Sequence, residues 1–202
     1  MVITWYGEGC FKVQSGELTL LSDPFQGVTG LTPPRLKADI VLATEALSPL
    51  PYGGNDAGRV VFGPGEYEIR GVEIAGWPLK SSPEGALRNI FRVVIEDMRL
   101  GFLGHCAEYE DDILEKFGEI DILIIPAGGA PFLSEESAVK LIKQVDPRIV
   151  IPAFFKIAGL KRRAGDLHAF LKEMGQNVEP VKKFLVRKKE LPQATKVVAL
   201  EV

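Results

Sequence analysis

The chain has 202 residues, of which 46% are hydrophobic and 25% charged, and its formal net charge at pH 7 is −3. These values are ordinary for a globular protein, and no apolar run approaches the roughly 18 residues that indicate a membrane span. The composition therefore excludes a disordered chain and a helical membrane protein. A chain of this length is most simply one domain over residues 1–202.

The first half of the chain predicts short strands separated by turns. The runs at 2–6, 10–15 and 18–22 are joined through turns that contain glycine, which predicts antiparallel pairing. The apolar run at 38–43 predicts a buried strand. The remaining predicted elements are strands at 58–62, at 66–76 and at 89–104, the last divided at Glu96-Asp97, and a polar loop at 80–89.

The second half alternates strands with helices, which predicts an α/β protein whose sheets are covered by helices. A helix is predicted over 134–147, where Ser134 can cap the first turn and Ala138, Leu141, Ile142 and Val145 form one apolar stripe. A second helix is predicted after Asp166 and ends at Gly175. Strands are predicted at 120–129, 148–155 and 196–200.

Seven phrases in this sequence, taken together and in this order, resemble the metallo-β-lactamase superfamily. They are ITWYGEGCF, LLSDPF, ADIVLATEALSPL, GPGEYEIRGVEI, FLGHCAE, DILIIPAGG and PRIVIPAFFK, and they cover nearly the whole chain. The resemblance is closest to a small bacterial branch of metal-dependent hydrolases related to L-ascorbate-6-phosphate lactonase. It implies a four-layer αββα sandwich with an active site at one edge, between the two sheets. There a pair of metal ions, usually zinc, would activate a hydroxide.

Most positions that carry metal ligands in this family carry other residues here. The main ligand loop of the family aligns with TEALSPL, so Glu45, Leu47 and Leu50 stand where the resemblance places histidines. The other altered positions are Glu8 and Glu108 in place of histidines, His105 in place of the bridging aspartate, and Phe154 in place of the last ligand. Leucine and phenylalanine cannot bind zinc, and they raise the cost of placing a cation in the pocket.

The leading interpretation is therefore a protein without a metal pair, with a binding, scaffold or regulatory role and an unidentified ligand or protein partner. We expect Glu45, Leu47, Leu50, His105 and Phe154 to fill the former active-site edge. Glu8 and Glu45 are expected to pair with Lys or Arg, or with His105, because grouped carboxylates without a cation repel each other.

Two alternatives remain for the polar groups of this pocket. Glu8, Glu45, His105 and Glu108 could form a rearranged site for zinc or manganese and support hydrolysis of phosphoesters or lactones. Cys106 follows His105 and could act as a nucleophile, although adjacent side chains on one strand exit tend to point apart. Glu66 lies in the glycine-rich turn GPGEYEI and is interpreted as structural.

Charge is distributed unevenly along the chain. Residues 1–155 hold 13 Lys or Arg and 22 Asp or Glu, whereas residues 156–202 hold 11 and 5. The basic segments 156–165 and 181–189 are interpreted first as a solvated face, and alternatively as one patch for nucleic acid or another acidic partner. No nucleic-acid-binding signature accompanies them.

The cellular location and the oligomeric state are predicted from general properties of the sequence and not from a specific motif. The N-terminal stretch lacks a basic region followed by a long apolar run, so we expect no signal peptide. The sequence contains two cysteines, Cys10 and Cys106, and so low a number favours a reducing compartment over a disulfide framework. We expect a cytoplasmic protein with no membrane partner, and a homo-oligomer because closed homo-oligomers are common.

Overall fold

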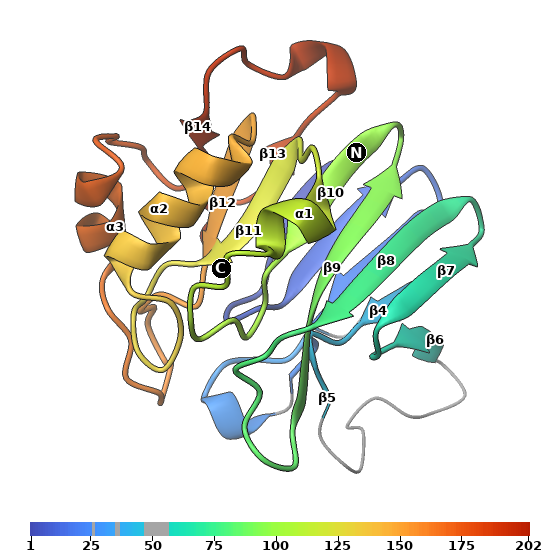
Figure 1. Cartoon of the computed structure of the whole chain (residues 1–202), viewed down its shortest axis with the longest axis horizontal. Coiled ribbons are helices and arrows are strands. Elements are labelled where there is room, and N and C mark those ends of the chain that lie inside the picture. The colour runs from blue at the N-terminus through green and yellow to red at the C-terminus, as the bar shows by residue number, and fades with distance from the viewer. Residues whose placement is uncertain (26, 35–36, 47–56) are drawn as a thin grey trace.

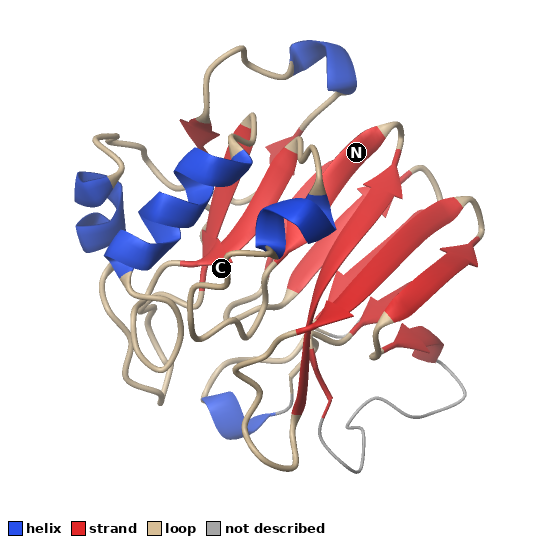
Figure 2. Cartoon of the chain, in the orientation of Figure 1, coloured by secondary structure: helices blue, strands red, loops and turns tan. Residues whose placement is uncertain are grey.

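Two β-sheets pack face to face, and α-helices cover the outer face of one of them (Figures 1 and 2). The computed structural model describes residues 1–25, 27–34, 37–46 and 57–202. The six-stranded sheet has the spatial order β13 (Phe184–Leu185), β1 (Val2–Trp5), β2 (Phe11–Ser15), β3 (Leu18–Ser22), β4 (Ala38–Leu42), β6 (Ala57–Val61).

The second sheet has eight strands. Its main path runs β14 (Lys196–Val197), β12 (Ile149–Ala153), β11 (Ile122–Pro126), β10 (Met98–Phe102), β9 (Leu87–Ile95), β8 (Val72–Pro78), β7 (Gly65–Ile69), and β5 (Glu45–Ala46) pairs with β9 off this path. Strands β10, β11 and β12 are parallel, whereas β7, β8, β9 and β10 are successively antiparallel. This mixed arrangement, with helices in the parallel part, confirms the predicted α/β sandwich.

One hydrophobic core fills the space between the sheets, because alternate residues of each strand face inward. Ile3, Trp5 and Phe11 come from the six-stranded sheet, and Phe91 and Phe102 come from the other. All five are at most 2% exposed. The antiparallel pairing predicted for the first three strands is confirmed by the registers of β1 with β2 and of β2 with β3.

A second core lies between the eight-stranded sheet and three helices, α1 (Ile113–Phe117), α2 (Glu135–Val145) and α3 (Leu167–Glu173). The predicted cap and stripe of α2 are present, since the Ser134 side chain accepts a hydrogen bond from the Ser137 backbone and the stripe is buried. Asp166 likewise caps α3. No helix of the described residues is long and apolar enough to cross a membrane.

Several predicted elements differ from the structure. The single strand predicted at 66–76 is a hairpin of β7 and β8 that turns at Arg70-Gly71. Leu87 and Arg88 belong to β9, not to a loop, because they pair with β5, and Asn89 pairs with β8. The final strand is shorter than predicted and ends at Val197. The sequence analysis also missed the five-residue helix α1, which is too short for its apolar residues to show a helical period.

The two sheets join at one edge, where the chain leaves β4 and β10. Thr44 follows β4, and its carbonyl accepts a hydrogen bond from the Asn89 backbone on β9 at 2.8 Å. Gly104 follows β10 with a φ of +47°, and a Cβ there would lie 2.0 Å from the Thr44 hydroxyl oxygen. This close approach requires glycine.

Replacing Gly104 should therefore weaken the junction. We expect Gly16→Ala, at a φ of +56° with no atom within 4 Å of the new Cβ, to cost only the backbone strain of about 1 kcal/mol. Gly104→Ala carries the same strain plus a steric clash, and should lower the free energy of unfolding by about 1–3 kcal/mol more. Urea denaturation of the two variants measures this difference, and equal losses would contradict the account.

Candidate functional site

Four polar residues and one phenylalanine follow strands that end at the same edge of the sandwich. Glu8 follows β1, Asp23 follows β3, Thr44 follows β4, His105 follows β10 and Phe154 follows β12. Strands β3 and β4 are parallel to each other, and so are β10, β11 and β12. The carboxyl ends of these strands therefore meet at one edge. Loops leaving such an edge are a favoured place for chemistry.

A buried hydrogen-bonded chain links the two sheets at this edge. Asp23 accepts hydrogen bonds from the Thr44 backbone at 2.6 Å and from its hydroxyl at 2.7 Å. The same hydroxyl oxygen lies 2.8 Å from Nδ1 of His105. Since a hydroxyl has one proton, donation to Asp23 leaves the Thr44 oxygen to accept the Nδ1 proton. Burial raises the pKa of Asp23, while His105 and the Thr44 hydrogen bonds oppose that rise.

Glu45 is held by an arginine on the neighbouring strand. Residues 45 and 88 are directly opposite in the β5–β9 pair, and Arg88 donates from Nε to a Glu45 carboxylate oxygen at 2.8 Å. Both side chains are largely buried, with exposed fractions of 15% for Arg88 and 18% for Glu45. The second Glu45 oxygen lies 3.9 Å from Nε2 of His105, beyond hydrogen-bond distance.

Glu8 is held by an arginine from the loop after β12. Arg162 donates to the two Glu8 carboxylate oxygens at 3.2 and 3.3 Å, and to the carbonyl of Phe154 at 2.7 Å. The carbonyl of Glu8 in turn accepts from the indole of Trp5 at 2.9 Å. Arg162 therefore joins the ends of β1 and β12 across the site.

Aromatic rings occupy the space between these charged pairs. The Phe154 ring lies 5.1 Å from the His105 ring and 4.5 Å from that of Phe132, and His105 and Phe132 are 5.6 Å apart, centroid to centroid. The guanidinium of Arg162 lies over Phe132 at 5.1 Å. A Cβ at Gly9 would lie 2.7 Å from the Phe154 ring, so this ring is packed tightly.

The structure brings together four of the residues predicted for this pocket: Glu8, Glu45, His105 and Phe154. The expected pairing of Glu8 and Glu45 with basic side chains is present. Leu47 and Leu50 lie outside the described residues, so their predicted positions in the pocket stay a prediction.

The other predicted site residues point elsewhere. The thiol of Cys106 lies in the core beneath the helices and donates to the carbonyl of Glu108 at 3.1 Å. Burial raises its pKa to about 12, which removes it as a nucleophile at neutral pH. Glu108 itself is exposed. Glu66 is also exposed, and its side chain lies on the outer face of the eight-stranded sheet, on β7.

Sequence reasoning missed five residues that build the site: Asp23, Thr44, Arg88, Phe132 and Arg162. Asp23 and Thr44 fall within quoted phrases of the resemblance, so their place at strand ends was available as a signal. Arg88 was assigned to a loop, and no local pattern shows that Arg162 reaches a carboxylate 154 positions away.

The residues at this edge do not fit a metal pair. His105 supplies an imidazole at this edge, and its Nδ1 is hydrogen-bonded to the Thr44 hydroxyl. Glu45 and Glu8 are held by guanidinium groups, Asp23 accepts hydrogen bonds from Thr44, and the Phe154 ring packs against the imidazole. Within the described ranges, no group of three or more His, Cys, Asp or Glu side chains could hold a metal ion. No chemical step is therefore assigned to a metal.

The two basic segments of the C-terminal quarter lie at opposite ends of the strands. Gly165 donates to the carbonyl of Gly128, beyond the end of β11, whereas Lys188 pairs with Asp121, just before β11 begins. Five strand residues, or about 16 Å, separate those two positions. The prediction that segments 156–165 and 181–189 form one patch stays a prediction, which would have to extend along the length of β11.

Comparison with known proteins agrees with the fold. A metallo-β-lactamase superfamily protein of Thermotoga maritima, assigned provisionally as a zinc-dependent hydrolase, is 26% identical and has a TM-score of 0.82 over 98% of this chain and 97% of its own. The fold of YhfI from Bacillus subtilis matches with a TM-score of 0.66 at 11% identity, over 99% and 96%. A UPF0173 protein of Pyrococcus abyssi is 28% identical over 86% of this chain and 90% of its own length.

The two sheets with helices on one outer face, and the polar strand ends at one edge, define a protein of the metallo-β-lactamase type. Residues 2–153 match the Beta-lactamase superfamily domain, so the chain belongs to that family. The resemblance noted in the sequence is thereby confirmed.

The pairing of Arg88 with Glu45 can be measured with a double-mutant cycle. Arg88→Met leaves a largely buried carboxylate without its donor and should lower the free energy of unfolding by about 1–3 kcal/mol. In a Glu45→Gln background the loss should shrink, giving a coupling energy of about 0.5–3 kcal/mol.

The exposed pair Arg99–Glu119 provides the control, because its side chains are 44% and 88% exposed. Its coupling energy should be at most about 1 kcal/mol. A coupling between Arg88 and Glu45 no larger than this would contradict the structural role given to that pair.

Proposed function

We propose that this protein is a non-catalytic member of its family with a binding, scaffold or regulatory role. The observation that carries the proposal is that two arginines, Arg88 and Arg162, pair with two of the carboxylates at the candidate site, Glu45 and Glu8. The edge at which the family places its metal pair is, on this reading, closed by the protein's own side chains.

The identity of the substituted residues supports the proposal. Hydrolysis in a metal site needs donors that hold the cation and an open position for water and substrate. At this edge the Phe154 ring packs against His105 and against Phe132. A phenyl ring offers no ligand atom, and it excludes the water that would attack a substrate.

The hydrolase descriptions of structural relatives do not by themselves transfer this activity. Activity depends on the site and not on the fold. The alternative, a hydrolase with a rearranged metal site at Glu8, Glu45, His105 and Glu108, has less support, because Glu108 is exposed and the two other glutamates already bind arginine. Its predicted cofactor would be zinc or manganese.

A cytoplasmic location forms part of the proposal. Cys10 and Cys106 are both free and buried, and burial raises the pKa of each thiol. Free thiols are typical of a reducing compartment.

A hydrolysis panel tests the proposal. The purified protein should show no metal-dependent turnover of phosphoesters or lactones when zinc or manganese is added. Turnover that is abolished in His105→Ala and retained in His168→Ala, an exposed control on α3, would contradict the proposal and favour the rearranged metal site.

A further inference from the structure

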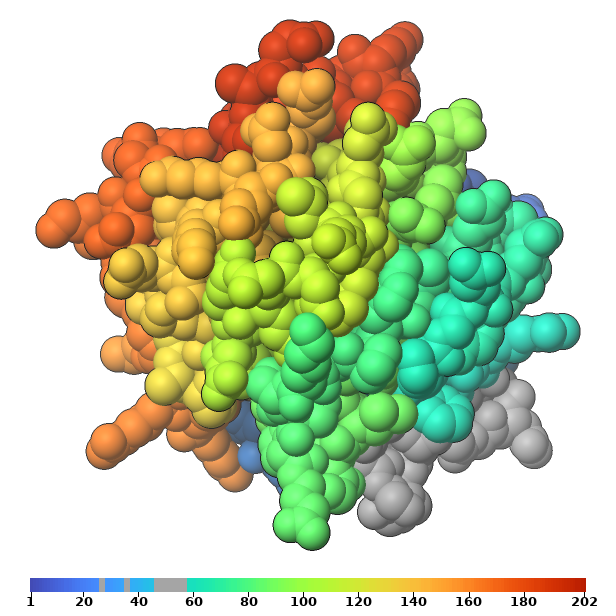
Figure 3. All heavy atoms as spheres, in the orientation of Figure 1, coloured from blue at the N-terminus to red at the C-terminus, as the bar shows by residue number. Residues whose placement is uncertain are grey.

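The strand β7 forms a free edge of the eight-stranded sheet. It pairs with β8 on one side, and among the described residues no strand pairs with its other side. The described helices cover the parallel part of this sheet but not β7 and β8, which lie at the surface on the right of the view (Figures 1 and 3). An edge strand presents unpaired backbone N–H and C=O groups, and these can bind another extended chain.

The turn between β7 and β8 determines which backbone groups of β7 are free. The two residues after Ile69 have φ values of +54° and +79°, which are typical of a two-residue hairpin turn. Ile69 and Val72 close this hairpin, and such a closing pair exchanges both of its backbone hydrogen bonds. Bonded pairs alternate along an antiparallel ladder. The backbone N–H and C=O groups of Glu66 and Glu68 therefore point away from β8, toward the free edge.

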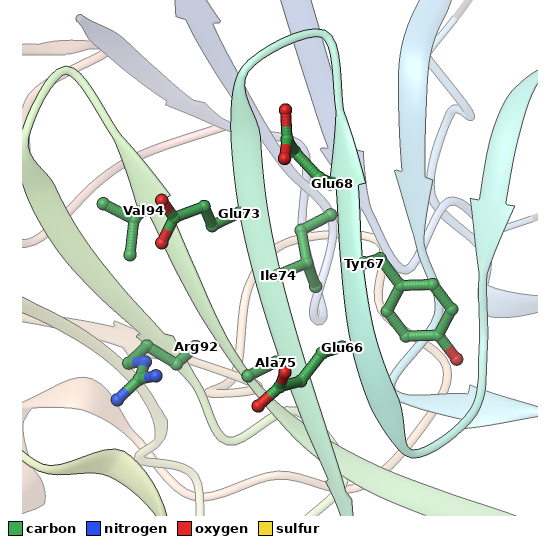
Figure 4. A pocket seen from close by; sticks show the side chains of 8 residues that line it. All are labelled: Glu66, Tyr67, Glu68, Glu73, Ile74, Ala75, Arg92 and Val94. Carbon is green, nitrogen blue, oxygen red and sulfur yellow. The ribbon is translucent and has the colours of Figure 1, made fainter.

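The side chains of the same two glutamates carry negative charge on the outer face of the sheet (Figure 4). Tyr67 and Ile69 pack toward the core, so Glu66 and Glu68 face outward, and both are exposed. Glu68 lies directly opposite Glu73 of β8, which is also exposed. Like charges at directly opposite positions destabilise a sheet. No ion pair with another described residue offsets the charge of these three carboxylates.

A hollow of about 360 Å³ continues this acidic surface over β8 and β9 (Figure 4). Ala75 and Val94 contribute apolar surface to it. Arg92 also lines the hollow, but its guanidinium donates to the carbonyl of Phe117 at 3.1 Å and lies over the Trp77 ring at 5.7 Å. This arginine is therefore held by other groups, and the hollow suits the aliphatic stem of a long basic side chain.

A second copy of this chain is a poor partner for the free edge. Two β7 strands paired around a two-fold axis would bring Glu66 and Glu68 of one copy beside the same residues of the other, and these carboxylates repel each other. The same charges favour an extended segment with lysine or arginine at every second position, because alternate side chains of a strand lie on one face.

We propose that the free edge of β7 binds an extended segment of another protein, with lysine or arginine at alternate positions, by antiparallel strand addition. The basic residues of that segment lie directly opposite Glu66 and Glu68. Each exchanges both backbone hydrogen bonds with the glutamate that it faces and places its side chain beside the carboxylate. This surface uses no residue of the candidate site at the strand ends, so this proposal and the non-catalytic role can fail independently.

Fluorescence anisotropy with synthetic peptides tests the backbone pairing. A labelled peptide of about ten residues, in which lysine and threonine alternate, should bind at about 0.05 M salt and bind more weakly at about 1 M, where the Debye length falls to about 3 Å. N-methylation of the lysine amides should weaken binding about tenfold or more, because those amides donate to the carbonyls of Glu66 and Glu68. N-methylation of the threonine amides should leave the affinity unchanged, because those amides face away from β7.

Substitutions in the protein test the charge. Glu66→Gln with Glu68→Gln keeps the strand and should weaken binding of the alternating peptide about tenfold. Glu17→Gln with Glu84→Gln removes the same charge at exposed positions outside β7 and β8, and should leave the affinity unchanged. The proposal is overturned if the unmethylated peptide does not bind, if both methylated peptides lose affinity equally, or if both variants bind equally well.

Discussion

Carboxylates gathered at one edge of a sandwich require a cation beside them, because like charges in a partly buried site repel and lose the solvation of water. In this protein guanidinium groups meet that requirement. Arg88 holds Glu45 from the neighbouring strand, and Arg162 holds Glu8 while also binding the carbonyl of Phe154. These two contacts tie β5 to β9 and the end of β1 to the end of β12 at this edge.

The third carboxylate, Asp23, is treated differently. It is 6% exposed and accepts two hydrogen bonds from Thr44, a residue that also contacts His105 from the opposite sheet. The hydrogen bonds from Asp23 through Thr44 to His105 cross the junction between the sheets. Gly104 makes this contact possible, because the absence of a Cβ leaves room for the Thr44 hydroxyl. The same geometry that would fix donors around a metal fixes hydrogen bonds between two sheets here.

The predictability of each feature follows from the range of the interaction behind it. Strands β1 to β4 and helix α2 were predicted because period, capping and turns are local properties of the sequence. The grouping of Glu8, Glu45, His105 and Phe154 followed from the family resemblance. Arg162 could not be predicted, because its contact with Glu8 joins residues 154 positions apart and depends on how the loop after β12 folds back. The placement of the two basic segments near opposite ends of β11 could not be predicted for the same reason, since charge along a sequence does not show which end of a strand it reaches.

The central claim is that arginines and aromatic side chains take the place of a metal pair. The most direct test is the metal content of the purified protein, measured by elemental analysis after incubation with zinc or with manganese and then desalting. The account predicts close to zero equivalents of either metal. One or two tightly held equivalents would contradict it, because a cation bound by Glu45 or Glu8 would have to displace Arg88 or Arg162 from that carboxylate.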